Sequence, residues 1–403
     1  MRVLIADTFE QSGRDALESA GFAVDYQPQL DSGALASAVT DADVLVVRST
    51  RVPAEVFAEG GPLGLVIRAG AGHNTIDSQA AAARAVFVAN VPGKNAVAVA
   101  ELTLGLILAI DRRIPENVAA ARGGTWNKNE FSRSAGLLGK TLGIIGLGQV
   151  GLAVAERSVA FGINVLVVDK NRPQPTLERM RELGILAVPD LATLLEQSDI
   201  VTLHVPGSAE TKGLVDASFL AQMRPEAMLI NTSRGDVIDE AALLATMDEK
   251  NLRVGLDVFA AEPGSGTGTF DSPLVSHPRV YTTHHIGAST SQAQEAIAAE
   301  VVEMIKDYAG GVARNVVNLT PPAPLGSLLV VRHFDRVGVL SAVLGALREA
   351  GLNVQEMKNE VFSGAGASVA SIQVQGPLPG PVLESLKGNP DVIFASVRDI
   401  LAL

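Results

Sequence analysis

Three polar residues in the second half of the chain each follow a short apolar run and together suit hydride chemistry on a 2-hydroxy acid. Arg234 follows the run in "LINTSRGDVID", Glu262 closes "GLDVFAAEP", and His285 lies in "VYTTHHIGAST". An imidazole can take the hydroxyl proton as hydride leaves the adjacent carbon, while a neighbouring carboxylate orients the ring. A guanidinium can bind the substrate carboxylate through its planar fork. Taken singly, each residue is equally well explained as a surface ion pair, a loop charge or a structural histidine, so only the combination is informative.

A glycine motif near the middle of the chain predicts the cofactor that such chemistry needs. The stretch "LGIIGLGQVG" (142–151) places Gly146, Gly148 and Gly151 directly after an apolar strand and at the start of a helix expected over 149–162. In a dinucleotide site the first glycine makes the turn, the second admits the pyrophosphate, and the third lets helix and strand pack closely. The spacing alone would fit a plain tight turn, but a further strand, "INVLVVD", follows the helix and favours a dinucleotide site.

The end of that further strand bears on which dinucleotide binds. Asp169 would accept hydrogen bonds from the adenosine ribose and would repel a 2′-phosphate, so NAD is favoured over NADP. Lys170 and Arg172 follow closely and weaken this preference.

The elements that must position these residues form two parallel sheets in series. Short Val/Ile/Leu runs alternate with helical patterns, which is typical of α/β folds. One α/β domain is complete before the glycine motif, so the cofactor domain is inserted into the other domain. The chain would return to the first domain after about residue 287, through a helix from about Ser289 to Ala309. We therefore expect a substrate domain over 1–94 and 288–318, with a dinucleotide-binding Rossmann domain over 95–287.

The C-terminal part follows a different pattern. The proline-rich "LTPPAPLG" (319–326) indicates a linker. Residues 327–403 show strand, helix, strand, strand, helix, strand, which predicts a ferredoxin-like βαββαβ module.

Composition restricts the possible functions. A formal net charge of -12 disfavours a broad nucleic-acid or anionic-membrane surface, although a local basic pocket remains compatible with it. The chain has no cysteine, so it has no disulfide, no thiolate catalysis and no Cys-ligated zinc, and we expect no metal site. The apolar stretch 96–110 is too short to cross a bilayer and contains Glu101, which indicates a buried or interface helix. Without a signal-peptide pattern, a cytoplasmic location is the expectation.

Over residues 1–318 the chain resembles the D-isomer-specific 2-hydroxyacid dehydrogenase family, and in particular its members that oxidise 3-phospho-D-glycerate. The resembling motifs are "GKTLGIIGLGQVG", "SDIVTLHVPGSAETKGL", "LINTSRGDVIDEAAL", "GLDVFAAEP" and "HHIGAST". The family's catalytic Arg, Glu and His match Arg234, Glu262 and His285. Its acidic contact to the nicotinamide carboxamide matches Asp257. His284 stands where the family usually has proline, and we assign it no catalytic role.

The resemblance also implies sets of binding residues. Those expected at NAD are Gly146, Gly148, Gln149, Val150, Gly151, Asp169, His204, Val205, Pro206, Thr232 and Asp257. Those expected at the substrate are Arg48, Arg51, Ala69, Gly70, Ala71 and Asn95. The glycine-rich loop would offer backbone N–H groups to the carboxylate, and the arginines would meet a phosphate. The arginine loop "VVRSTRVP" is one residue shorter than is usual, which leaves open whether Arg48 or Arg51 points inward.

The C-terminal module resembles an ACT domain, a ferredoxin-like unit that commonly binds amino acids. His333 and Asn353 match the positions that hold serine in sensitive relatives, but Asp335 replaces an asparagine and would repel the amino acid's carboxylate. Regulation by L-serine is a hypothesis on this basis. The resemblance further implies a homodimer through the cofactor domains, or a homotetramer through paired ACT domains.

The resulting prediction is an NAD-dependent enzyme that converts 3-phospho-D-glycerate to 3-phosphohydroxypyruvate, the first step of serine biosynthesis. The alternatives are a glyoxylate or hydroxypyruvate reductase of the same family and a non-catalytic NAD-sensing binding protein.

Overall fold

A computed structural model describes residues 1–58, 61–263, 267–320, 326–363 and 366–400. The chain forms two compact units, Met1–Asn318 and Leu319–Leu403. Most of the expected linker 319–326 lies outside the described residues.

The first sheet is entirely parallel, with strand order β2-β1-β3-β4-β5. Its strands are β1 (Arg2–Ile5), β2 (Ala23–Tyr26), β3 (Val44–Val47), β4 (Leu65–Arg68) and β5 (Phe87–Asn90). One apolar cluster joins this sheet to α1 (Gln11–Ser19) and α12 (Ser291–Ala309), and a second joins it to α2 (Leu35–Ala38), η1 (Ala54–Phe57) and α3 (Ser78–Ala83). Because helices cover both faces, a central strand such as β3 is buried at every position.

The second sheet is also parallel, with order β12-β11-β10-β9-β6-β7-β8. Its strands are β6 (Thr141–Ile145), β7 (Asn164–Val168), β8 (Leu186–Val188), β9 (Ile200–Leu203), β10 (Met228–Asn231), β11 (Arg253–Leu256) and β12 (Val280–Thr282). The strand order reverses between β6 and β9, which is the switch point where doubly wound sheets bind ligands. Of these strands, β8 was absent from the sequence-based expectation.

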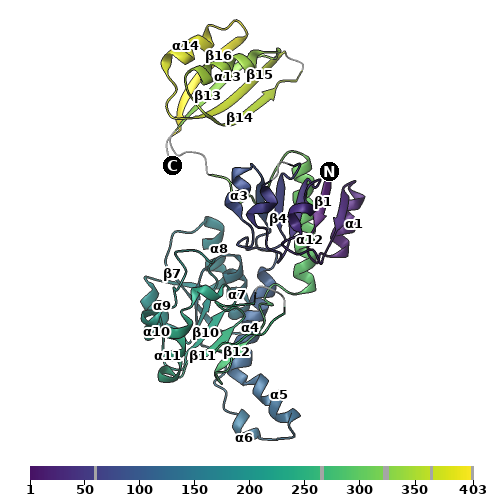
Figure 1. Cartoon of the computed structure of the whole chain (residues 1–403). Helices are drawn as coiled ribbons and strands as arrows, with labels where there is room; N and C mark the ends of the chain where they lie inside the picture. Colours follow the sequence, from purple (N-terminus) through teal and green to yellow (C-terminus); the bar gives the residue numbers. More distant parts are fainter. Residues whose placement is uncertain (59–60, 264–266, 321–325, 364–365, 401–403) are drawn as a thin grey trace. The chain divides into compact units, whose positions relative to one another are not determined.

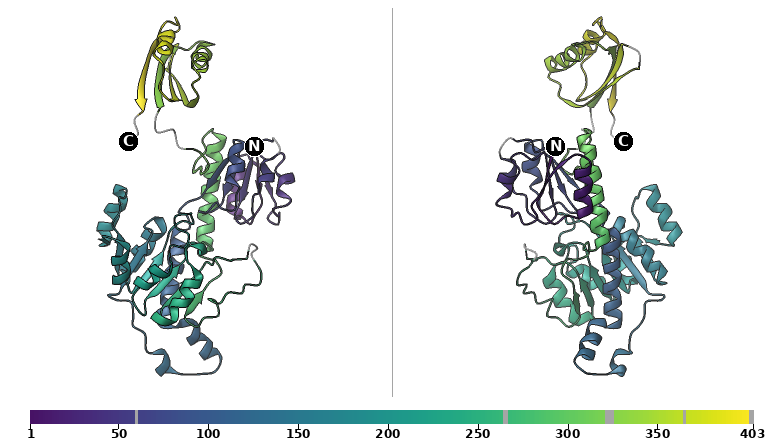
Figure 2. Two further views of the ribbon diagram at one scale, coloured as in Figure 1. Left: turned by 60° about the vertical axis from the view of Figure 1, so that its left-hand side comes forward. Right: turned by 90° about the vertical axis from the view of Figure 1, so that its right-hand side faces the viewer.

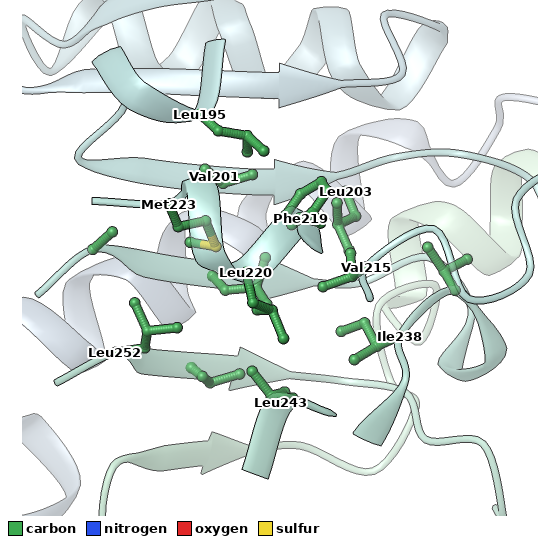
Figure 3. Packing of buried hydrophobic residues seen from close by; sticks show 14 of the residues in the cluster. Leu195, Val201, Leu203, Val215, Phe219, Leu220, Met223, Ile238, Leu243 and Leu252 are labelled. Carbon is green, nitrogen blue, oxygen red and sulfur yellow. The ribbon is translucent and has the colours of Figure 1, made fainter. Parts of the chain in front are cut away.

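Helices cover both faces of the second sheet. They are α7 (Gln149–Ala160), α8 (Gln174–Leu183), α9 (Leu191–Gln197), α10 (Ala217–Gln222) and α11 (Glu240–Lys250), with the short η2 (Gly235–Val237) after β10. Figure 3 shows one apolar layer, in which Leu195 of α9 and Phe219 of α10 lie beside Val201 and Leu203 of β9, while Leu243 of α11 lies further along the sheet. This layer, packed on one face of the sheet, holds the strands so that their carboxyl ends form one rigid edge.

Two long helices connect the sheets. α4 (Ala96–Arg112) begins just after β5 and packs against α7, β10 and β11, so its apolar side is buried as expected for 96–110. α12 follows β12 and returns to the first sheet, where it lies beside α1 (Figure 2). The second sheet is thus inserted between β5 and α12. α5 (Ile114–Arg122) and α6 (Lys128–Phe131) project from the inserted part (Figure 1). Within the described ranges, no helix is long and apolar enough to span a bilayer.

The second unit is an antiparallel sheet of order β14-β15-β13-β16 with two helices. Its elements are β13 (Gly326–Phe334), α13 (Val339–Glu349), β14 (Val354–Val361), β15 (Ala367–Gln375), α14 (Gly380–Lys387) and β16 (Val392–Ile400). Buried and less buried residues alternate along β13 and β15, because one face packs on the helices. This is the βαββαβ connectivity of a ferredoxin-like fold.

Candidate active site

The residues expected at the cofactor gather at the carboxyl edge of the second sheet. Gly146, Asp169, His204, Thr232 and Asp257 each come directly after the last residue of a different parallel strand. Because all these strands run the same way, their ends meet at one edge. The switch point between β6 and β9 lies within it.

The turn from β6 into α7 has the geometry of a pyrophosphate cradle. Gly146 adopts φ +97°, and a side chain there would strike the carbonyl of His204. A β-carbon on Gly151 would strike the carbonyl of Gly146, so helix and strand pack closely only with glycine. At Gly148, by contrast, no atom lies within 4 Å of where a β-carbon would stand. Open space therefore faces the first N–H groups of α7, which lack intrahelical partners.

The residues around this turn leave the Asp169 carboxylate open and keep the His204 ring neutral. Asp169 is exposed at the end of β7, and the guanidinium of Arg172 folds back to donate to the carbonyls of Val168 (2.6 Å) and Lys170 (3.1 Å). His204 Nε2 lies 2.9 Å from the hydroxyl of Thr202, while its Nδ1 is buried with no partner among the described residues. Burial lowers the pKa of His204 to about 3, so this ring is neutral. The residues present therefore fit a dinucleotide.

The structure brings together His285 and Glu262, the two side chains that the sequence predicts to act as an acid–base pair. His285 Nδ1 lies 2.7 Å from Glu262 Oε2, and Glu262 Oε1 accepts the N–H of Phe259 at 2.8 Å. Burial by itself would raise the pKa of Glu262, but the hydrogen bonds from His285 and Phe259 and the charges of His285 and Arg234 bring it below its ordinary value. Glu262 is therefore an anion that orients the imidazole. The other ring nitrogen, Nε2, has no partner in the described part of the chain.

Asp257 shapes the loop that carries His285. It is 1% exposed, and its carboxylate accepts the Thr283 hydroxyl (2.6 Å) and the N–H groups of Ile286 and Gly287 (2.9 Å each). Its own carbonyl accepts the N–H of His285, whose φ of +51° is unusual for a residue with a side chain. The sequence assigned Asp257 only to the nicotinamide, whereas the geometry also makes it the support of the His285 loop.

Arg234 is placed by a side-chain turn that sequence reasoning missed. Asn231, at the end of β10, accepts the N–H and hydroxyl of Ser233 through Oδ1 and donates through Nδ2 to the carbonyl of Arg234 at 2.8 Å. The hydroxyl of Thr232 instead meets Thr103 of α4 at 2.9 Å. The guanidinium of Arg234 reaches the glycine-rich loop after β4, where a β-carbon on Gly72 would strike its Nη2. Arg234 thus faces the substrate-domain loop.

That loop offers different N–H groups from those expected. The N–H of Ala69 donates to the backbone carbonyl of Val47 (2.7 Å), and the N–H of Gly70 donates to the backbone carbonyl of Arg68 (2.8 Å). Neither N–H is therefore available to a substrate. Among the described residues, the N–H groups of Ala71 and Gly72 have no acceptor. The expected trio of Ala69, Gly70 and Ala71 is therefore corrected to Ala71 and Gly72, because the first two N–H groups complete the end of the sheet.

A third arginine completes a cationic cluster that the sequence analysis did not identify. Arg68 ends β4, and its guanidinium lies over Gly70, where φ is +150° and a β-carbon would collide with it. Burial, followed by repulsion from Arg234 and Arg48, lowers the pKa of Arg68 to about 10, and Asp7 opposes this. Arg68 forms no ion pair within the described ranges. The sequence feature that could have identified Arg68 as a site residue is its position at the end of a buried strand, just before a glycine-rich loop.

The two arginines of the loop after β3 differ in exposure, and Asn95 lies apart from them at the start of α4. Asp7 Oδ2 accepts the N–H groups of Arg48, Ser49 and Thr50 at 2.7–3.0 Å, which folds the loop after β3. Arg48 is half-buried and close enough to Arg68 to repel it, whereas Arg51 is exposed. Asn95 is the N-cap residue of α4, and its side chain makes no cap hydrogen bond.

The candidate effector residues are not brought together within the second unit. His333 is 2% exposed, and its two ring nitrogens lie 2.7 Å from the Phe334 carbonyl and 3.1 Å from Asn359 Oδ1. Asp335, two residues after His333, is exposed. Asn353 lies at the opposite end of the sheet, beside Gln375, whereas His333 pairs with Ser368. One copy of this unit cannot place His333 and Asn353 on a single small ligand.

Comparison with known proteins identifies the family of the chain. The NAD binding domain of the D-isomer specific 2-hydroxyacid dehydrogenases matches residues 104–287, so the inserted part is an NAD-binding dehydrogenase domain. The hydroxypyruvate reductase of Thermotoga maritima is 38% identical over 278 residues, which are 68% of this chain and 88% of that protein. The chain belongs to the D-isomer specific 2-hydroxyacid dehydrogenase family.

Other relatives extend the comparison. The D-3-phosphoglycerate dehydrogenase of Methanocaldococcus jannaschii is 38% identical over 333 residues, 81% of this chain and 62% of that protein. This chain thus spans less than two thirds of the length of such curated relatives. The crystal structure of the TT0316 protein from Thermus thermophilus matches with a TM-score of 0.69 and 33% identity, covering 79% of this chain and 100% of that one.

Proposed function

We propose that the protein oxidises 3-phospho-D-glycerate to 3-phosphohydroxypyruvate with NAD. The observation that carries the proposal is the group formed by Arg48, Arg68 and Arg234 in a chain of net charge -12, facing the pair of Glu262 and His285. A substrate with a carboxylate and a phosphate matches such a concentration of guanidinium groups. Relatives named D-3-phosphoglycerate dehydrogenase support the same substrate.

The proposed mechanism gives each residue one task. His285 Nε2 takes the proton of the substrate's 2-hydroxyl as the C2–H bond breaks and the carbonyl forms. Glu262 remains anionic and stabilises the imidazolium through Nδ1. Arg234 and the N–H groups of Ala71 and Gly72 bind the carboxylate, while Arg68 and Arg48 bind the phosphate. NAD, when bound, supplies the hydride acceptor.

The cofactor would be held by the residues at the carboxyl edge of the second sheet. The pyrophosphate would lie over Gly148 and the first turn of α7, with Gln149 and Val150 donating their N–H groups. Asp169 would accept from the ribose hydroxyls, and Val205 and Pro206 would line the opposite side. Asp257 retains acceptor capacity for the carboxamide beyond its three internal bonds.

A substrate panel with arginine variants tests the proposal. We expect Arg68→Ala and Arg48→Ala each to raise the KM for 3-phospho-D-glycerate at least about tenfold, with little effect on unphosphorylated glycerate or glyoxylate. Arg51→Ala, at the exposed arginine of the same loop, is the matched control and should change KM little. Equal losses on phosphorylated and unphosphorylated acids would contradict a phosphate site. His285→Ala should abolish turnover with every acid.

A hydroxypyruvate reductase is the second candidate. The Thermotoga maritima relative of that name is matched over 88% of its length, whereas the first relatives named D-3-phosphoglycerate dehydrogenase are matched over less. The same panel separates the two, since a hydroxypyruvate reductase would prefer the unphosphorylated acid and would be insensitive to Arg48→Ala.

We further propose that the second unit is an ACT domain that binds an amino-acid effector between two copies of the protein. The separation of His333 and Asn353 within one copy supports a shared site. Exposed apolar residues on α5 and the loop after it, Ile114, Val118 and Trp126, support a homodimer or homotetramer. A cytoplasmic location remains part of the proposal. Titration calorimetry with L-serine and sedimentation with and without it test both points. No heat at millimolar serine would remove serine as the effector.

A further inference from the structure

Asn90 occupies the place where the first sheet, the glycine-rich loop and the crossover into α4 meet. It is the last residue of the edge strand β5 and is paired in register with Arg68 at the end of β4. Its amide Nδ2 donates to the carbonyl of Ala71 at 2.6 Å. The next residue, Val91, donates its N–H to the backbone carbonyl of Gly70 at 2.9 Å.

This hydrogen bond orients a specific peptide group. The carbonyl of Ala71 and the N–H of Gly72 belong to one trans peptide, in which they point in opposite directions. Holding the oxygen on the side of Asn90 therefore turns the Gly72 N–H to the other side. That N–H has no acceptor among the described residues, and a β-carbon on Gly72 would touch Arg234.

The backbone of Asn90 is itself held from the outer edge of the sheet. Asn90 donates its N–H to the carbonyl of Asn315 at 3.3 Å, and Ala89 pairs with Val316 in an antiparallel bridge. Asn318 completes this edge by accepting the Val88 N–H and donating to the Val86 carbonyl, both at 2.9 Å. Residues 315–318 thus prevent β5 from shifting, so the direction of the Asn90 side chain is set.

We infer that Asn90 is a positioning residue for substrate binding, which acts by aiming the Ala71–Gly72 peptide at the substrate carboxylate. The inference rests on the proposed function, in which that peptide contacts the carboxylate. Since the contact exists in both the bound substrate and the transition state, losing its alignment weakens binding without slowing the chemical step.

The test compares Asn90→Ala and Asn90→Asp with Asn318→Ala in the full chain. Asn90→Asp keeps the shape and removes the donor, while Asn318→Ala removes hydrogen bonds to the same strand away from the loop. We expect both Asn90 variants to raise the KM for 3-phospho-D-glycerate about tenfold, the factor for one well-aligned hydrogen bond. The kcat and the dissociation constant of NADH should stay the same, and Asn318→Ala should lower only thermal stability.

A second measurement separates this inference from the proposed function. Oxalate carries the carboxylates without a reacting hydroxyl, so its affinity for the NADH-bound protein, measured by calorimetry, should fall in both Asn90 variants and not in Asn318→Ala. An unmodified chain with no turnover on any 2-hydroxy acid would remove the proposed function and this inference with it. An active unmodified chain whose Asn90 variants keep their KM and oxalate affinity would overturn the inference alone. A parallel loss in Asn90 and Asn318 variants would make the role structural, which also overturns it.

Discussion

Asp257→Asn is the most informative single change, because two roles for Asp257 predict different outcomes. The buried carboxylate accepts three hydrogen bonds from the loop of His285. Asparagine keeps one oxygen for Thr283 and Ile286 but turns an NH2 group toward the N–H of Gly287, so a donor faces a donor. A lost bond to a charged acceptor together with a buried unpaired N–H costs about 3 kcal/mol. In a unit of this size that lowers the Tm by roughly 5 °C.

The same change should impair the chemistry more than cofactor binding. A loosened loop misplaces the imidazole, and a displacement of about 1 Å lowers kcat about a hundredfold. We expect calorimetric melting and steady-state kinetics to show both losses while the dissociation constant of NADH, from fluorescence, is little changed. Asp216→Asn, at the exposed cap of α10, is the control and should leave Tm and kcat in place. An unchanged Tm with a raised NADH dissociation constant would refute the support role.

Three further predictions address the rest of the site. Glu262→Gln removes the charge beside His285, so kcat should fall roughly a hundredfold in steady-state assays, within the range of acid–base catalysis; full activity would contradict the pair. Gly72→Ala places a methyl group against Arg234 and should raise the KM for the acid about tenfold with little change in Tm, and a normal KM would show that the guanidinium lies elsewhere. His204 has a folded pKa of about 3 against an ordinary value of 6.5, so only the unfolded chain takes up a proton between these values. The neutral His204 ring therefore contributes fully to the free energy of unfolding above pH 6.5. This contribution is lost as the pH falls, and the loss is about 2 kcal/mol at pH 5. Denaturant unfolding of His204→Gln should therefore depend less on pH than that of the unmodified chain, and identical slopes would exclude this origin.

The positions of the site elements were predictable wherever one short segment contains the whole signal. The glycine turn before α7 is such a segment, since strand, glycines and helix are contiguous and each glycine has a local steric reason. The ends of β10, β11 and β12 could be predicted in the same way, because apolar runs locate the strands. Since parallel strands end at one edge of the sheet, the residues that follow them could be expected to lie together. β8 was missed; it is a short strand at the edge of the sheet, and two of its three residues are exposed, so it lacks the buried apolar run that marks the other strands.

The sequence by itself determined the parallel sheets, the inserted glycine turn and the residue types of the proposed acid–base pair. Only the tertiary structure decided that Arg68 joins Arg48 and Arg234, that Asp257 carries the His285 loop, and that Ala71 and Gly72 replace Ala69 and Gly70 as free donors. The physical reason is that hydropathy and glycine spacing report on neighbours along the chain. A buried charge or a satisfied N–H depends on partners from distant segments, and those partners become known only when the strand ends are placed side by side.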